Sequence, residues 1–149
     1  MRFAFVLSLL MTVVMSTTAT SEDRASLEDA KAMAQKAAAH YRQAGEAAAL
    51  ADFMKSPKWR DRDLYVFAVK VDGMMLANAA NPAFVGRNLG QMKDVDGNPI
   101  QSMLVAVKDE GWVEYRWRNP TTDAIEWKST YVVRVGDSLI IGVGAYKKK

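Results

Sequence analysis

The 149-residue sequence contains no cysteine and one histidine, His40. Without cysteine there can be no disulfide bond, thiolate catalysis, cysteine-ligated zinc, iron–sulfur cluster or covalently attached haem. No Asp, Glu or Cys lies three or four residues from His40, and the chain has no G-x-S-x-G motif or phosphate-binding loop. We therefore predict no metal site, no cofactor and no enzymatic activity. His40 is interpreted as a surface or boundary residue of a helix rather than a ligand or a pH sensor.

A strong charge of one sign is also lacking. The 20 Lys and Arg residues and 17 Asp and Glu residues give a net charge of +3, and three of the basic residues are the terminal Lys147, Lys148 and Lys149. A surface that binds nucleic acid would need Lys and Arg clustered on one face. No nucleic-acid partner is therefore predicted.

The only long apolar run lies at the N-terminus. Arg2 is followed by apolar residues from Phe3 to Met15, and Thr17 and Ala19 suit a signal peptidase. This pattern predicts a signal peptide over residues 1–19 and an exported domain over residues 20–149. An uncleaved membrane anchor is the alternative, but the run is shorter than the ~20 residues that a span needs.

Proline is absent between Leu27 and Met54, where small apolar residues, mostly alanine, recur at spacings of three and four. Ser26, with Asp29 three residues later, resembles a capping box. The pattern predicts one long amphipathic helix whose alanine stripe allows another surface to approach closely. A coiled-coil stalk is the alternative, although an alanine seam is weak for that.

Strand patterns fill most of the remaining chain, and Asp72-Gly73 and Gly136-Asp137 mark tight turns between them. The predicted elements are strands at 64–71, 74–77, 111–118, 124–135 and 139–146, a loop-rich crossover at 78–99 and a short helix at 100–109. This order predicts an α+β fold, with a long N-terminal helix packed on a five-stranded antiparallel sheet. The crossover would cover the other face and leave a cavity there.

Two local patterns carry more specific expectations. The run from Asp94 to Pro99 lacks the spacing and the closing Glu of an EF-hand, so we predict an Asx-type turn rather than a calcium site. Gly142 and Gly144 lie within the last predicted strand. Such glycines often mark a close approach by another backbone or by a packed helix.

The hairpin at 111–135 holds three of the four tryptophans. Strict alternation places Lys128 in the opposite phase to Trp127, Ser129 and Tyr131. On this basis one wall of the cavity is predicted to contain Tyr115, Trp117, Ser129 and Tyr131. The same aromatic residues could instead fill the core, and Trp117 fits a core position best. An anionic ligand would need a cation, for which Lys128 is the first candidate and Arg116 the second.

Five segments in this order resemble the single Cache domain, type 2, a PAS-like extracytoplasmic sensor module of bacterial chemoreceptors and sensor kinases. The segments are DLYVFAVKVDG (63–73), LANAANPAFVGRNL (76–89), KDVDGNPI (93–100), GWVEYRWRNP (111–120) and KSTYVVRVGDSLIIGVGAYK (128–147). The resemblance covers about residues 27–147. It implies a long N-terminal helix behind a five-stranded sheet, with a cavity for small organic molecules, often short carboxylates, on the other face.

Three details qualify the resemblance. Asn78 stands where the family commonly has histidine, and Trp127 stands where it commonly has proline, so the ligand cannot be carried over. The family motif that begins at Lys128 implies that this residue lies near the ligand, and a bulge at 127–128 would reconcile that with the alternation. Only three lysines follow Tyr146, so the chain resembles the free-standing exported form of the domain.

Together these features predict a periplasmic domain that binds a small organic acid through Asn78, Arg116, Lys128 and the hairpin residues and acts through a membrane sensor or transporter. The alternative is a structural protein without ligand that forms a homodimer through its long helix.

Overall fold

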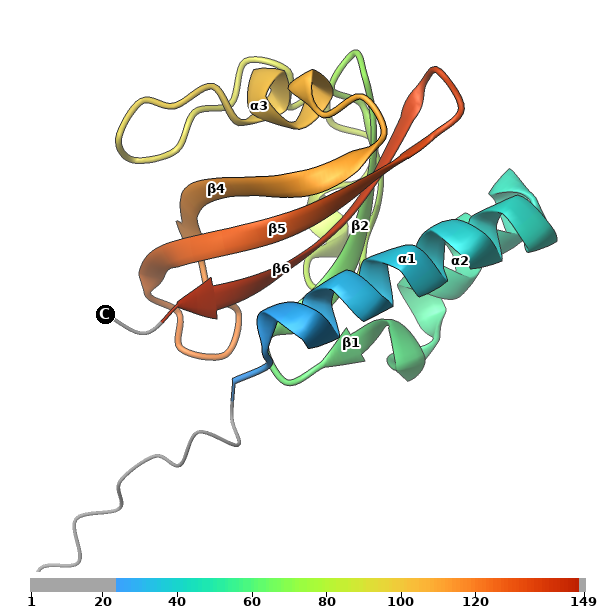
Figure 1. Ribbon diagram of the computed structural model, residues 1–149, viewed down its shortest axis with the longest axis horizontal. Coiled ribbons are helices and arrows are strands. Elements are labelled where there is room, and N and C mark those ends of the chain that lie inside the picture. The colour runs from blue at the N-terminus through green and yellow to red at the C-terminus, as the bar shows by residue number, and fades with distance from the viewer. Residues whose placement is uncertain (1–23, 148–149) are drawn as a thin grey trace, which may run out of the picture.

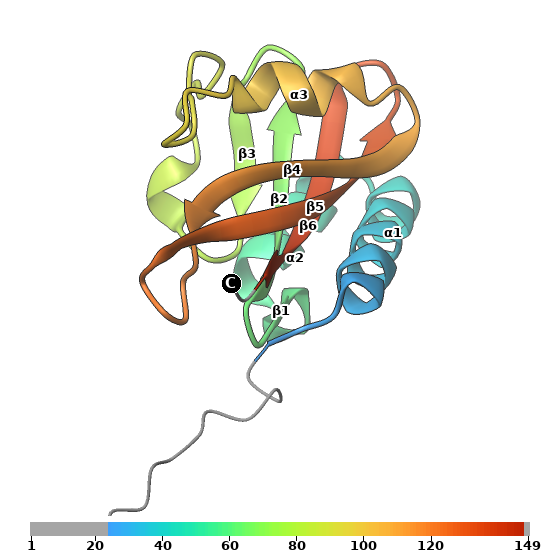
Figure 2. The ribbon, with the colours of Figure 1, turned by 60° about the vertical axis from the view of Figure 1, so that its left-hand side comes forward.

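The computed structural model describes residues 24–147, so the predicted signal peptide lies outside the described residues. Helices cover one face of a six-stranded antiparallel sheet, and the crossover with one short helix lies over the other face (Figures 1 and 2). The fold is therefore α+β, as predicted. The elements are α1 (Leu27–Ala44), α2 (Glu46–Lys55), η2 (Pro57–Trp59), β1 (Arg60–Asp61), β2 (Leu64–Lys70), β3 (Met75–Asn78), η3 (Pro82–Phe84), α3 (Ile100–Ala106), β4 (Glu110–Arg118), β5 (Ile125–Val135) and β6 (Leu139–Lys147).

The strand order is β1-β2-β6-β5-β4, and β3 also pairs with β2. The predicted meander of the last three strands is confirmed, and β6 closes the sheet by pairing with β2. The two-residue strand β1 was not predicted. β4 is an edge strand, so its outer backbone groups need other partners.

The prediction of one continuous helix over 27–54 is wrong. The capping box at Ser26 and Asp29 starts α1 as predicted, but the helix stops before Gly45, whose φ of 83° and ψ of 163° are accessible almost only to glycine. The chain turns back there, and Asp52 Oδ2 of α2 lies 3.0 Å from Nε2 of His40. His40 is half-buried between the two helices, at the boundary position that was predicted. The periodicity missed the break because both helices are amphipathic.

Alternation along the strands produces a separate core on each face. On the helix side, branched residues such as Val66, Ile141 and Val143 pack against the buried alanines of α1. On the other side, Tyr65, Phe67 and Val69 of β2 face α3 and the crossover. The apolar run at 64–71 therefore forms a strand that is covered on both sides, as predicted.

Gly45→Ala should lower the free energy of unfolding by about 1–3 kcal/mol, because alanine is strained at this φ and ψ although the space around it is open. Urea unfolding measures the loss. Gly111→Ala is the matched control, since its added Cβ would lie an ordinary 3.6 Å from Val107 Cγ1. An equal loss in both variants would contradict the assignment of strain to Gly45.

Candidate functional site

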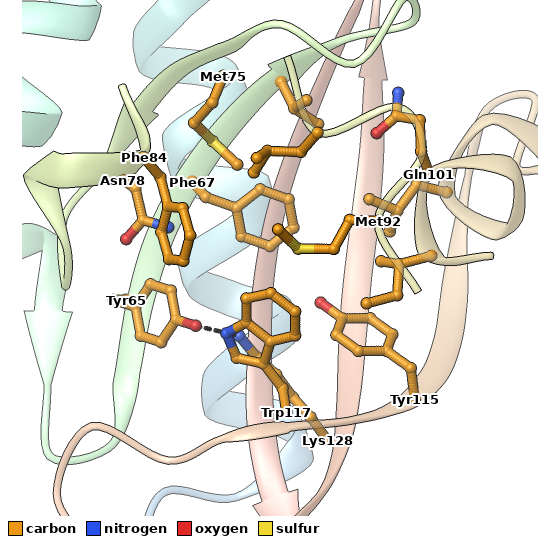
Figure 3. Close-up of a pocket in the computed structure, with 14 residues that line it drawn as sticks. Tyr65, Phe67, Met75, Asn78, Phe84, Met92, Gln101, Tyr115, Trp117 and Lys128 are labelled. Atoms are coloured by element: carbon orange, nitrogen blue, oxygen red, sulfur yellow. Dashed lines mark hydrogen bonds between the residues drawn. The ribbon is translucent and has the colours of Figure 1, made fainter. Parts of the chain in front are cut away.

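A cavity of about 50 Å³ lies between the sheet and the crossover, where the sequence predicted one (Figure 3). Its walls are mainly apolar and come from β2, β3, β4, β5, α3 and the crossover. One water molecule needs roughly 10–15 Å³ of such space, so about three to five non-hydrogen atoms fit. The cavity thus suits a very small organic molecule.

The ammonium group of Lys128 enters this cavity from β5, and only 1% of the residue is exposed. Lys128 Nζ donates a hydrogen bond of 2.8 Å to the Tyr65 hydroxyl. It also lies 4.0, 5.1 and 5.6 Å from the ring centroids of Tyr65, Tyr146 and Phe67. Within residues 24–147 Lys128 makes no ion pair. Removing a charge from water costs several kcal/mol, and desolvated cation–π contacts of about 2 kcal/mol or more offset part of that cost. No carboxylate within residues 24–147 supplies the counter-charge.

Gly144 of β6 makes room for this side chain. A Cβ at Gly144 would overlap Cε and Cγ of Lys128 and the hydroxyl of Thr130. Gly142 does the same for the ring of Phe67. Both glycines therefore make room for side chains of the cavity face, and not for the second backbone or the packed helix that was expected.

A chain of hydroxyl groups leads away from the ammonium. Tyr146 donates to the carbonyl oxygen of Arg118 over 2.8 Å, so the 3.3 Å contact between the Tyr65 and Tyr146 hydroxyls must use the proton of Tyr65. Burial, followed by the effect of Tyr65, raises the pKa of Tyr146 far above its usual value. Tyr65 thus accepts from Lys128 and donates onward, which leaves the ammonium with two further N–H donors.

Tyr115 supplies a second donor to the cavity. Its hydroxyl accepts a 3.0 Å hydrogen bond from Thr130, and it points into the cavity (Figure 3). Burial raises the pKa of Tyr115 and outweighs the opposing charge of Lys128. Its O–H therefore stays protonated and can donate to a ligand.

Asn78 supplies a third donor from the end of β3, and it is 4% exposed. Its Oδ1 accepts hydrogen bonds from the backbone of Ala80 (3.1 Å) and Asn81 (2.9 Å). These bonds fix the orientation of the amide, so Nδ2 faces the cavity as a donor (Figure 3).

The predicted grouping of Ser129 and Tyr131 with Tyr115 on one wall is wrong. Tyr115 pairs across the hairpin with Lys128, and directly opposed residues of antiparallel strands share a face. Tyr115, Trp117 and Lys128 therefore face the cavity, whereas Ser129 and Tyr131 face the opposite side. There Ser129 donates to Glu114 (2.7 Å), and Tyr131 lies under Lys31. The pairing runs through 127–128 without a bulge, so the proposed bulge is not needed.

Arg116 does not line this inner cavity. It lines an outer cavity of about 440 Å³ next to it, together with Lys93, Asp94 and Arg118. The two cavities share four lining residues, which are Tyr65, Asn78, Phe84 and Trp117.

Several cavity residues were not predicted, notably Tyr65, Phe67 and Gln101. Tyr65 and Phe67 lie in a strand that is apolar on both faces, so its pattern does not reveal which face borders the cavity. The Nε2 atom of Gln101 donates to the backbone oxygens of Lys70 (2.8 Å) and Val71 (3.3 Å). The sequence contains no local signal for that contact.

Asp94 holds the crossover against the edge of the sheet. Its Oδ1 accepts from the backbone of Asp96 and Asn98, both at 2.9 Å, which confirms the predicted Asx-type turn. Its Oδ2 accepts from Asn98 Nδ2 (2.9 Å) and from the backbone N–H of Arg116 on edge strand β4 (3.2 Å). Burial alone would raise the pKa of Asp94, but these hydrogen bonds outweigh burial and lower it.

Comparison with known proteins supports the fold and the family. The model of the family described as Single Cache domain 2 matches residues 6–148. The fold is similar to that of a methyl-accepting chemotaxis protein from Vibrio parahaemolyticus RIMD 2210633, with a TM-score of 0.70 and 22% identity over 80% of this chain and 86% of that chain. No curated protein matches the chain.

Two further solved structures share the fold. One is described as the structural basis for carboxylic acid recognition by a Cache chemosensory domain, with a TM-score of 0.62 and 24% identity over 81% of this chain and 88% of that chain. The other is the periplasmic sensor domain of a chemotaxis protein, with a TM-score of 0.62 and 21% identity over 81% of this chain and 90% of that chain.

Asp94→Asn should lower the free energy of unfolding at pH 7 by about 1–3 kcal/mol, because an amide nitrogen would face donors that now bind Oδ2. The pKa of Asp94 in the folded protein lies below its ordinary value of 3.8, so its contribution is complete above that value and is lost as the pH falls through the folded pKa. The difference between wild type and variant should therefore shrink below about pH 4. Urea unfolding at several pH values measures it, and a difference independent of pH would contradict this role.

Lys128→Met should raise the free energy of unfolding of the ligand-free protein by about 1–4 kcal/mol, because it removes a buried charge that has no carboxylate partner. Lys70→Met is the control, since Lys70 is exposed and should change stability by no more than about 0.5 kcal/mol. Chemical unfolding of both variants checks this. Clear destabilisation by Lys128→Met would mean that the ammonium contributes to the stability of the empty domain.

Proposed function

Because the chain belongs to the single Cache domain 2 family, a family of extracytoplasmic ligand-sensing domains, we propose that it binds a small carboxylic acid outside the cytoplasm and passes the signal to a partner protein. The observation that carries this proposal is the buried ammonium of Lys128 without an ion-pair partner among residues 24–147. A ligand carboxylate would be the missing counter-charge.

The donors around the cavity match a carboxylate. An ionised carboxylate accepts hydrogen bonds only, at about four lone-pair positions. Lys128 has two N–H groups left, and Tyr115 and Asn78 each offer one more donor. Charge-assisted hydrogen bonds of this kind are about twice as strong as neutral ones. The apolar walls then suit a short hydrocarbon tail, as in acetate or propionate.

The comparisons support the same class of ligand. A structure with the same fold is described as a Cache chemosensory domain that recognises carboxylic acids. At 24% identity that similarity supports the fold. Which acid binds must therefore be inferred from the cavity residues of this chain. Binding of this kind needs no catalytic group, so a receptor role accounts for the site without an enzymatic activity.

The partner and the location of the domain are also part of the proposal. The predicted signal peptide would deliver the domain to the periplasm, where it would act through a membrane sensor or transporter. Within residues 24–147 no helix is long and apolar enough to cross a membrane.

A homodimer through the long helix is the weaker alternative. The alanine stripe that would form the dimer interface instead packs within the domain, since Ala30, Ala34, Ala37 and Ala38 are buried in its core. Substitution of Ala37 would therefore disturb the fold as well as any dimer.

Acetate or propionate should bind the purified domain, and their neutral amides, acetamide and propionamide, should not. The amides keep the shape but lack the charge that Lys128 requires. Calorimetry measures affinity, and a hundredfold excess of ligand over Kd should stabilise the domain by about 2.7 kcal/mol.

Lys128→Met should weaken binding of the acids by at least about tenfold, whereas Lys70→Met should leave it unchanged. If the short acids bind no better than the amides, or bind Lys128→Met as well as wild type, the proposed ligand class is wrong.

A further inference from the structure

The outer cavity lies beside the inner cavity, and the proposed function leaves it unused. It measures about 440 Å³, compared with about 50 Å³ for the inner cavity. Tyr65, Asn78, Phe84 and Trp117 border both. In Figure 3, Phe84 and Trp117 lie beside Tyr65, whose hydroxyl binds Lys128. A ligand held at Lys128 that extends past these side chains would enter the outer cavity.

The charged groups of the outer cavity are not equally available to a ligand. Arg118 donates to Asp123 twice, to Oδ1 at 2.8 Å and to the carbonyl oxygen at 3.0 Å. The carboxylate of Asp94 already accepts hydrogen bonds from Asp96, Asn98 and the backbone of Arg116. The carboxylate of Asp94 is therefore occupied by contacts within the protein. Arg118 is 60% exposed and forms an exposed ion pair, so a ligand would gain little from it in competition with water.

Unlike Asp94 and Arg118, Arg116 has a buried N–H donor that is available to a ligand. Its only ion pair within residues 24–147 is with Asp96, at 3.5 Å, and Asp96 is exposed. Its Nε atom is buried and has no hydrogen-bond partner in the same part of the chain. Asp94 accepts a hydrogen bond from the backbone N–H of Arg116, which fixes the position of this residue along the edge strand. Lys93, which also lines the outer cavity and makes no ion pair in the described chain, adds positive charge. A guanidinium group with free N–H donors is well matched to a second carboxylate.

We propose that the outer cavity is a second anion subsite centred on Arg116, so that the domain prefers dicarboxylic acids over monocarboxylic acids of the same length. One carboxylate binds Lys128 in the inner cavity, and the other binds Arg116 in the outer cavity. This inference rests on the proposed function, because it takes Lys128 as the site of the first carboxylate. Arg116 then determines specificity and Lys128 provides the common anchor.

Calorimetry with matched pairs of ligands tests the inference. Malonate, succinate and glutarate are each compared with the half-amide in which one carboxylate is replaced by a neutral carboxamide, so that length and shape are kept. In the wild-type domain at least one diacid should bind about tenfold more tightly than its half-amide. Arg116→Gln should reduce that ratio to about one and leave the affinity for the half-amide unchanged. Arg118→Gln removes the same charge from the same cavity, but the Arg118 side chain is 60% exposed, so the ratio should persist.

A second variant keeps the test valid if Arg116→Gln does not fold. Asp96→Asn removes the one carboxylate that pairs with Arg116, and it should increase the ratio of diacid to half-amide affinity. Ratios near one for all three pairs in the wild type would overturn the inference, as would an Arg116→Gln variant that weakens both members of a pair equally. An equal loss of the ratio in Arg118→Gln, or a ratio that Asp96→Asn leaves unchanged or lowers, would also overturn it. If the monocarboxylates bind while these results fail, only the second subsite is wrong. If no acid binds at all, the proposed function fails with it.

Discussion

The burial of the Lys128 ammonium is the constraint on which the ligand side of this domain depends. The side chain can lie there only because Gly144 leaves space for its stem and because three aromatic rings and one hydroxyl surround its head. Those contacts offset only part of the desolvation of the charge. Burial of this charge therefore lowers the stability of the domain, and the proposed carboxylate ligand would offset that cost.

The two faces of the sheet have different roles: one forms an apolar core with the helices, and the other borders the cavity. On the helix side, buried alanines let α1 lie close to the sheet, and the core there contains branched aliphatic residues together with Phe53, Trp59 and Tyr131. On the cavity side, aromatic residues, a lysine and an amide surround a space of about 50 Å³. Because β2, β5 and β6 contribute residues to both cores, the packing energy of the helix side stabilises the same strands that hold the buried charge of Lys128.

The crossover links the cavity to the edge of the sheet. Edge strand β4 has unpaired backbone groups, and Asp94 satisfies the N–H of Arg116 with a carboxylate oxygen. The same contact positions the loop that borders the outer cavity and keeps Arg116 beside it. One carboxylate thus protects a sheet edge, closes an Asx-type turn and positions a loop that borders the outer cavity.

The sequence by itself determined the five longer strands, the meander and the Asx-type turn, because each rests on residues near one another in the chain. Five motifs in a fixed order indicated the family. Tertiary structure decided which residues line the cavity and where the first helix ends. Alternation shows which residues of one strand share a face, but only the loop at 119–124, with Asp123 at a φ of 60°, sets which residue of β5 lies opposite Tyr115. That register brings Lys128 into the cavity and turns Ser129 and Tyr131 away from it. The break at Gly45 likewise depends on a backbone conformation that the helical periodicity does not reveal, and the contacts of Tyr65 and Arg116 join segments far apart in the chain.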